Sequence, residues 1–248
     1  MEADFLMKLD VLAFGAHPDD VELSLSGTLA KLSQLGHRTG VVDMVQGELG
    51  TRGNSKIRAR EARASAEVLG LKIRKNLALK DGYLHDTTEA RLKVIEQVRK
   101  YRPRLVFNHY WDDPHPDHVS TSQIVTSACY LSGLKKIETG QQRFRPDRIV
   151  YFRLPHYVHP SFLVDISVFF EKKMQAIRCF DSQLYNPKSG APQTYLSIPE
   201  FLPRLEALDR HYGLLINTGY AEAFYCKEAL AVGNPVAFLT KAQEVKTK

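Results

Sequence analysis

Features that mark membrane, secreted and disulfide-bonded proteins are scarce in this sequence of 248 residues. Its uncharged apolar runs, such as residues 11–16, are far shorter than the roughly 18–20 residues that cross a bilayer. No basic segment followed by an apolar stretch opens the chain, so the sequence gives no support for secretion. The three cysteines stand far apart and form no CxxC pair, which argues against a disulfide framework and a cysteine metal site. We therefore expect a cytoplasmic protein with no membrane partner.

The charge balance likewise lacks the pattern of a nucleic-acid-binding protein. There are 34 Lys and Arg against 28 Asp and Glu, a net charge of +6, and the basic residues are spread along the chain. No basic stripe with interleaved aromatic residues is present, so we expect no nucleic-acid partner. A modest positive field suits an anionic small molecule, although such a field on its own identifies no ligand.

What the sequence does contain is a repeated order of strand, polar loop and helix. Apolar and β-branched segments at 10–16, 39–45 and 104–108 predict buried strands. Residues 55–69 and 87–101 space their apolar side chains as helices do. This alternation predicts a parallel sheet with right-handed crossovers and helices on its faces.

In the second half of the chain, predicted strands and helices alternate less regularly. The elements expected there are strands at 148–153 and 163–168 and helices at 169–180 and 198–212. No linker or internal repeat divides the chain. We therefore predict one Rossmann-like α/β domain over residues 1–248 with a C-terminal elaboration, and disordered ends at 1–7 and 241–248.

Polar residues of metal-ligand type follow the predicted strands. Ala-His-Pro-Asp-Asp occupies 16–20 after the first strand, a glycine-rich loop occupies 47–53 after the second, and His-Pro-Asp-His occupies 115–118 beyond the third. In open α/β sheets, the loops at the carboxyl ends of adjacent strands meet and form the ligand site. We therefore expect these side chains to converge on one rim of the sheet.

His17, Asp20 and His118 form the kind of set that holds a catalytic zinc, with three protein ligands and one position open. His17 and Asp20 lie three residues apart at a strand-to-helix turn, and Pro18 stiffens the link between them. Two neutral imidazoles and one carboxylate leave the site a net positive charge, which lowers the pKa of bound water and polarises a substrate carbonyl. The same set also suits a non-haem Fe²⁺ oxygenase.

Acid and base candidates stand beside these ligands. Asp19 is free to act as general base on the water. A protonated His115 can stabilise an oxyanion or donate a proton to a leaving amine, with Asp117 orienting it. Taken alone, Asp19 and Asp20 fit the simpler role of capping a helix and complementing its dipole. The two motifs together favour a metal site, and the surplus of acid and base candidates favours hydrolysis over oxygenation.

Two further classes of function stay open at this point. A nucleotide-binding or regulatory α/β module is one, but Gly15 stands alone before the first turn, without the Gly-x-Gly-x-x-Gly run that admits a pyrophosphate. A metal-binding protein without catalysis is the other, and it would leave the acid and base positions idle.

These motifs resemble the PIG-L/LmbE-like family of zinc deacetylases, which remove the acetyl group from N-acetylglucosaminyl conjugates. The resemblance rests on Ala-His-Pro-Asp-Asp at 16–20, Gly-Thr at 27–28 and His-Pro-Asp-His at 115–118, and it covers nearly the whole chain. It implies one Zn²⁺ per chain, with Fe²⁺ as an alternative divalent metal. The chain departs from the family's usual pattern at 23–26, where it reads Leu-Ser-Leu-Ser instead of a segment rich in glycine and cysteine.

The resemblance also assigns roles to residues. It implies the zinc ligands His17, Asp20 and His118, the general base Asp19, and the acid His115 with its support Asp117. Arg52 matches a substrate-contacting arginine, and Glu48 lies where sugar hydroxyls are held. A guanidinium binds a carboxylate bidentately, which fits an anionic sugar substrate. From the residues alone, Arg52 is equally well a solvated loop residue.

Motifs of the second half resemble the bacillithiol-biosynthesis branch, whose enzymes deacetylate N-acetylglucosaminyl malate. They are Asp-Ser-Gln at 181–183, Asn-Pro at 186–187, Thr-Tyr-Leu-Ser at 194–197, Pro-Glu-Phe-Leu at 199–202 and Tyr-Ala-Glu-Ala-Phe at 220–224. The resemblance further implies a homo-oligomer, since relatives of this branch form hexamers. Deacetylation of another N-acetylated glycoside or small amide is the alternative.

Overall fold

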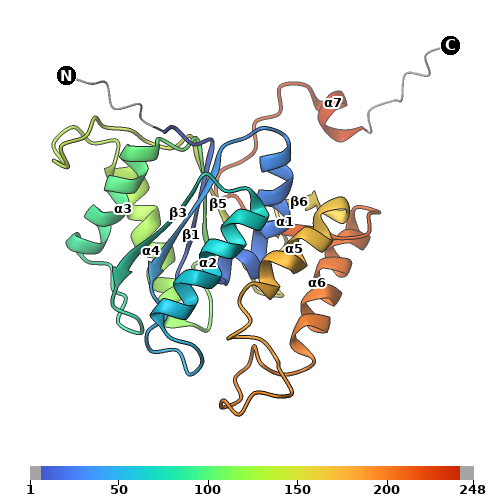
Figure 1. Cartoon of the computed structure of the whole chain (residues 1–248). Coiled ribbons are helices and arrows are strands. Elements are labelled where there is room, and N and C mark those ends of the chain that lie inside the picture. Colours follow the sequence, from blue (N-terminus) through green and yellow to red (C-terminus); the bar gives the residue numbers. More distant parts are fainter. Residues whose placement is uncertain (1–6, 241–248) are drawn as a thin grey trace.

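The structure, a computed structural model, describes residues 7–240 (Figure 1). Its strands are β1 (Val11–Gly15), β2 (Thr39–Val45), β3 (Ile73–Leu79), β4 (Leu105–His109), β5 (Arg148–Phe152), β6 (Phe162–Asp165) and β7 (Ala221–Phe224). Its helices are α1 (Asp20–Gln34), α2 (Ser55–Leu69), α3 (Thr88–Tyr101), α4 (Pro116–Leu131), α5 (Phe170–Arg178), α6 (Phe201–Leu215) and α7 (Pro235–Leu239), with a 3₁₀ turn η1 (Ser167–Phe169). The disorder predicted for 1–7 and 241–248 lies, Met7 excepted, outside the described residues.

One parallel sheet contains the first five strands, in the order β3-β2-β1-β4-β5. β1 and β2 are buried along their whole length, as expected of largely apolar strands in a sheet covered on both faces. The chain runs outward from β1 to β3 and then returns to β4 on the other side of β1. The carboxyl ends of β1 and β4 therefore flank a topological switch point, where such sheets bind ligands. The α/β fold predicted from the sequence is confirmed.

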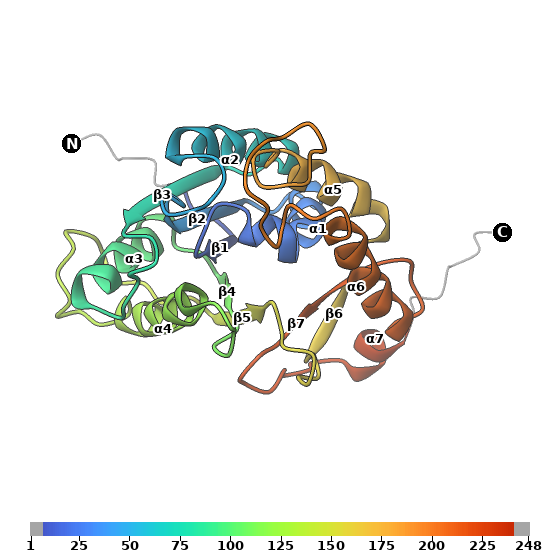
Figure 2. The same cartoon turned by 90° about the horizontal axis from the view of Figure 1, so that it is seen from below.

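Helices cover both faces of this sheet (Figure 2). Alternate residues of β1 point to opposite faces, so Leu12 and Phe14 pack with residues of α3 and α4, whereas Val11 and Ala13 pack with residues of α1. α5 lies against both α1 and α2. Within residues 7–240, no helix has both the length and the apolar character needed to cross a bilayer.

The second half adds the antiparallel pair β6 and β7 beside the β5 edge of the sheet. Tyr151 of β5 exchanges two backbone hydrogen bonds with Tyr225, just beyond β7, which joins the pair to the sheet. α6 packs against β7. The buried ammonium of Lys173 on α5 lies 2.8 Å from Asp209 of α6 and 3.0 Å from Glu222 of β7. These contacts join the C-terminal elaboration to β5 and to α5.

Two elements near the rim of the sheet were not predicted from the sequence. β3 is an edge strand that mixes basic and apolar residues, so it lacks the apolar run that marks a buried strand. α4 begins at Pro116, within a segment that reads as a polar loop. Proline is favoured at the first position of a helix, and His118 consequently lies in the first turn of α4. The strand expected at 163–168 is also shorter, because it ends before η1.

Candidate metal centre and active site

The loop that follows β1 places His17 and Asp20 side by side. The backbone N–H of His17 donates to Oδ2 of Asp20 at 2.8 Å, and Nδ1 of His17 lies 3.3 Å from the same oxygen. Asp20 begins α1 and is buried. The three-residue spacing therefore turns both side chains toward one point at the end of β1.

His118, in the first turn of α4, reaches the same point from the β4 side. Its Nε2 lies 3.2 Å from Oδ1 of Asp20, and its Nδ1 lies 2.9 Å from Oδ1 of Asp113. The buried ring of His109 stacks on His118 with ring centroids 4.4 Å apart, while its Nε2 accepts the backbone N–H of Ala16. These contacts fix the His118 ring at its far nitrogen and on one face.

His17, Asp20 and His118 fit a divalent metal ion. Their ligand atoms all lie within 4.8 Å of one another. The ring nitrogens that face away from this point each meet a carboxylate, since Nε2 of His17 lies 3.2 Å from Asp81 and Nδ1 of His118 meets Asp113. Carboxylates in that position orient metal-binding histidines and fix their tautomer. Two histidines and one carboxylate are a ligand set of catalytic zinc.

The charge at this point also favours a cation. Burial by itself raises the pKa of the Asp20 carboxyl, but the neighbouring His118, His109 and His17 outweigh burial and hold that pKa well below its usual range. In the part of the chain that the structure describes, no lysine or arginine pairs with Asp20. A buried carboxylate among imidazoles is an arrangement that can hold a metal ion.

Asp19 and the three ligand residues line a cavity of about 430 Å³, called here the metal pocket. The backbone φ of Asp19 is 124°, a conformation that residues with a side chain rarely adopt and that recurs at functional sites. Nη2 of Arg58 lies 2.9 Å from Oδ2 of Asp19. Burial raises the pKa of Asp19 to about 6, although Arg58 opposes this rise. Burial thus makes the Asp19 carboxylate a better proton acceptor than an exposed aspartate.

His115 and Asp117 lie beside His17. Nδ1 of His115 accepts the backbone N–H of Asp117 at 3.2 Å, so the neutral ring carries its proton on Nε2. The Asp117 carboxylate accepts the backbone N–H groups of Gly82 and Leu84 and lies 3.4 Å from Nε2 of His17. His115 thus has an N–H donor available at the metal pocket. Support of His115 by the Asp117 carboxylate stays a prediction.

The two residues predicted to bind substrate make contacts within the chain. Arg52 is buried, and its guanidinium donates to backbone carbonyl oxygens in the segment 182–192. Glu48 is exposed and accepts the backbone N–H of Asp81. Arg58, by contrast, lines the metal pocket. The substrate roles of Arg52 and Glu48 stay predictions.

Sequence reasoning missed four residues around the metal pocket, namely Arg58, Asp81, Asp113 and Arg153. Asp81 follows β3, and its signal was an Asp-Gly pair directly after a strand that was not recognised. Asp113 stands two residues before His115, in a loop already noted for its polar residues. Arg58 and Arg153 carried no local signal, because they lie outside both His-Pro-Asp motifs.

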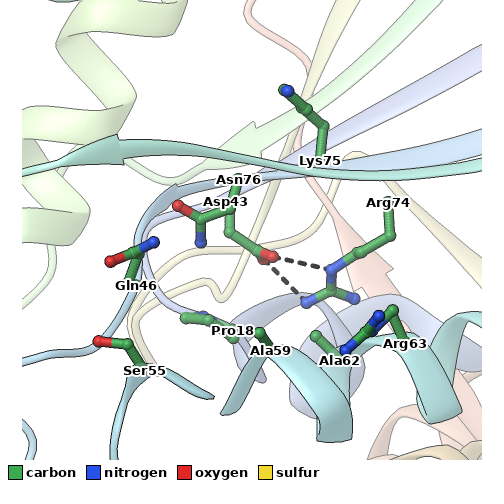
Figure 3. Close-up of a pocket in the computed structure, with 10 residues that line it drawn as sticks. All are labelled: Pro18, Asp43, Gln46, Ser55, Ala59, Ala62, Arg63, Arg74, Lys75 and Asn76. Atoms are coloured by element: carbon green, nitrogen blue, oxygen red, sulfur yellow. Dashed lines mark hydrogen bonds and ion pairs between the residues drawn. The ribbon is translucent and has the colours of Figure 1, made fainter. Parts of the chain in front are cut away.

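A second buried polar cluster surrounds Arg74 of β3, which Figure 3 shows beside Asp43 of β2. Nε and Nη2 of Arg74 donate to the two carboxylate oxygens of Asp43, each at 2.8 Å. Nη1 of Arg74 donates to Glu22 of α1, which also accepts the hydroxyl of Ser65. The carboxylates of this cluster are thus paired with a guanidinium of the chain itself.

Known proteins similar to this chain identify its family. The model of the PIG-L family, GlcNAc-PI de-N-acetylase, matches residues 12–129, which include both His-Pro-Asp motifs. Diacetylchitobiose deacetylase from Thermococcus kodakarensis is 30% identical in an alignment of 234 positions that covers 86% of this chain and 80% of that protein. The chain belongs to the PIG-L family.

Solved structures of similar proteins support the assignment to PIG-L. The conserved protein TT1542 from Thermus thermophilus is 35% identical, with a TM-score of 0.82 and coverage of 91% of this chain and 98% of that one. N,N'-diacetylchitobiose deacetylase from Pyrococcus horikoshii is 26% identical, with a TM-score of 0.75 and coverage of 95% of this chain and 87% of that one. The similarity thus extends beyond residues 12–129 into the C-terminal elaboration.

Proposed function

We propose that this PIG-L protein is a zinc-dependent hydrolase that removes the N-acetyl group of an N-acetylglucosaminyl conjugate and releases acetate and the free amine. The observation that carries the proposal is the convergence of His17, Asp20 and His118 with the Asp19 carboxyl and the His115 imidazole on one pocket. Metal-assisted amide hydrolysis requires a set of metal ligands, an adjacent base and an adjacent hydrogen-bond donor.

In this proposal, His17, Asp20 and His118 hold the metal, which when bound polarises the acetyl carbonyl and lowers the pKa of water. Asp19 accepts the proton of the attacking water, a role that its burial and its pairing with Arg58 both serve by fixing the carboxylate in place. Nε2–H of His115 donates a hydrogen bond to the oxygen that becomes negative, and the leaving amine takes up the proton that Asp19 received from the water. Fe²⁺ is the alternative metal, because the same ligands suit it.

The proposal also names a specific substrate and places the protein in the cytoplasm. The second-half motifs support N-acetylglucosaminyl malate, the substrate of the bacillithiol branch. The two diacetylchitobiose deacetylases among the similar proteins favour instead an acetylated sugar joined to a second sugar. The three cysteines are all free, which fits the reducing conditions of the cytoplasm.

The deciding experiment is acetate release by protein of known metal content. The substrates are N-acetylglucosaminyl malate, diacetylchitobiose and N-acetylglucosamine, each with and without a chelator. Release that the chelator abolishes and added zinc restores would support the hydrolase. The faster of the two conjugates would identify the substrate branch. No release from any of them by zinc-loaded protein would contradict the proposal.

The proposal also includes a homo-oligomer, with a hexamer expected by resemblance. Val168 and Leu214 are exposed over 86% and 73% of their surface, and large exposed apolar side chains are common at subunit interfaces. Light scattering coupled to size-exclusion chromatography would test it, and a monomer at micromolar concentration would contradict it.

A further inference from the structure

A groove of about 450 Å³ lies next to the metal pocket and continues it. The two cavities share four lining residues, Leu23, Arg153, Tyr195 and Leu196. The far side of the groove is formed by α6, through Phe201, Arg204, Leu208 and Tyr212. In Figure 2, α6 lies beside α5 and the β6–β7 pair, away from α3 and α4. A molecule whose acetyl group lies at the metal pocket can therefore extend into this groove past Arg153.

Arg153 stands at the boundary between the two cavities with one part of its guanidinium fixed and the rest available. Its Nε donates to Oδ2 of Asp113 at 3.0 Å, and Asp113 also holds Nδ1 of His118. Among residues 7–240, no hydrogen bond joins its two Nη atoms to the protein. The φ of Arg153 is +59°, an uncommon conformation for a residue with a side chain. Its position is thus set relative to the proposed metal ligands, and its Nη donors are available to a ligand.

The groove offers aromatic side chains and a second available cation. Tyr195 packs edge-to-face on Phe201 and is 67% exposed, which leaves ring surface for a ligand. Arg204 is exposed, and in the described part of the chain its guanidinium has neither a hydrogen bond nor an ion pair. Aromatic surface beside arginine suits a ligand with both a carbon skeleton and a negative charge.

The two acidic residues that line the groove are already paired. Lys173, fully buried, lies 2.8 Å from Asp209 and 3.0 Å from Glu222. Glu222 also accepts the backbone N–H groups of Gly27 and Thr28. Among residues 7–240, Arg204 is thus the charged residue of the groove that has no partner, and Arg153 keeps its two Nη groups available beside its pair with Asp113.

We propose that this groove is the subsite for the part of the substrate joined to the acetylated sugar, and that Arg153, assisted by Arg204, binds an anionic group on that part. The inference rests on the proposed function, because the proposed reaction places the acetyl group at the metal pocket. It assigns anion recognition to Arg153 and Arg204, whereas the guanidinium of Arg52 is engaged by the segment 182–192. Arg153 therefore distinguishes conjugates that carry an anionic group from those that do not.

Binding of deacetylated ligands tests the subsite without relying on turnover. Isothermal titration would compare glucosaminyl malate with methyl glucosaminide, which lacks the anion, on the zinc-loaded protein. A hydrogen bond to a charged group contributes enough for the malate conjugate to bind about tenfold more tightly. Arg153→Gln should remove most of this preference, and Arg204→Gln should reduce it about threefold, because an exposed charge contributes less. Glucosamine 1-phosphate in parallel would show whether a phosphate is bound as well as a carboxylate.

Arg210→Gln is the matched control, since Arg210 lies on the same helix but pairs with Glu206 and does not line the groove. It should leave the preference for the malate conjugate unchanged. A wild-type protein without the preference, or a preference that survives Arg153→Gln and Arg204→Gln, would overturn the subsite. If acetate is nevertheless released from acetylated sugars, the proposed hydrolase stands without this subsite. If the preference behaves as expected but no acetate is released, the subsite stands and the hydrolase fails.

Discussion

Two buried polar clusters lie on either side of the start of α1, and they differ in what completes them. Around Arg74, the carboxylates of Asp43 and Glu22 are paired with one guanidinium of the chain itself. At the metal pocket, Asp20 is surrounded by the imidazoles of His17, His109 and His118, with no lysine or arginine bonded to it in residues 7–240. The carboxylates of the first cluster are bound by a guanidinium of the chain itself, whereas the carboxylate of the second is bound by imidazoles, which are metal-ligand groups.

This difference explains why burial of charge alone does not identify a functional site. An ion pair that is complete within the chain can serve the fold, and a buried charge whose partners are imidazoles is suited to a metal. Asp19 combines the two features, because it forms an ion pair with Arg58 and also lines the metal pocket. Substitution of one residue in each cluster tests this difference.

The largest expected effect is that of removing a ligand. His118→Ala should abolish stable metal binding and lower the rate of acetate release about a thousandfold or more, because the metal supplies several kcal/mol of stabilisation to the transition state. Metal analysis after dialysis and an acetate assay would check both. His159→Ala, at an exposed histidine outside the metal pocket, is the control. One equivalent of tightly bound metal in His118→Ala would remove His118 from the ligand set.

The next effect separates metal binding from catalysis. Asp19→Asn keeps the size of the side chain but cannot accept a proton, so kcat should fall by about 10²–10⁴-fold. The metal content should stay at the wild-type value, because the ligands are untouched. Stopped assays on zinc-loaded variant and wild type, normalised to bound metal, would measure the loss. Turnover within about twofold of wild type would show that another group takes the proton.

Substitution of Arg74 should lower the stability of the protein and leave its metal content unchanged. Arg74→Met leaves Asp43 and Glu22 buried without their partner, which should lower the free energy of unfolding by about 3–5 kcal/mol. Arg178→Met is the matched control, because Arg178 forms an exposed pair with Glu171 and should cost less than about 1 kcal/mol. Urea denaturation would give both values. Loss of metal from a folded Arg74→Met protein would contradict the separation of the two clusters.

The smallest expected effect is a dependence of stability on pH that comes from Asp43. Burial raises the pKa of Asp43 from 3.8 to about 6, although Arg74 opposes the rise. Because the folded state binds this proton more tightly than the unfolded state, the stability contributed by protonation is present at low pH. It is lost as the pH rises from about 4 through about 6, by at most roughly 3 kcal/mol.

Asp43→Asn does not titrate, so it isolates this contribution. The free energy of unfolding of the wild type minus that of the variant should decrease between pH 4.5 and pH 7.5, with most of the change below the pKa of about 6. Urea titrations of both proteins at several pH values would show it. Parallel stability curves over this range would mean that Asp43 stays ionised throughout.

Much of the fold followed from local patterns in the sequence. Apolar runs predicted β1, β2 and β4, and the helical spacing of residues predicted α2 and α3. β3 was missed because an edge strand is partly solvated and carries basic residues in place of a continuous apolar run. With β3 missed, the loop after it was missed as a contributor to the site, and Asp81 with it.

The sequence by itself determined which residues of metal-ligand type follow the strands, because His17, Asp20 and His118 stand in short motifs whose spacing limits how they fold. Only the tertiary structure decided which groups hold them in place. Asp113 contacts His118 from the loop just before α4, but Asp81 and Arg153 reach the metal pocket from two other segments of the chain, brought there by strand order and helix packing. Contacts of that kind depend on how the elements pack in space, and no spacing along a single sequence encodes them locally.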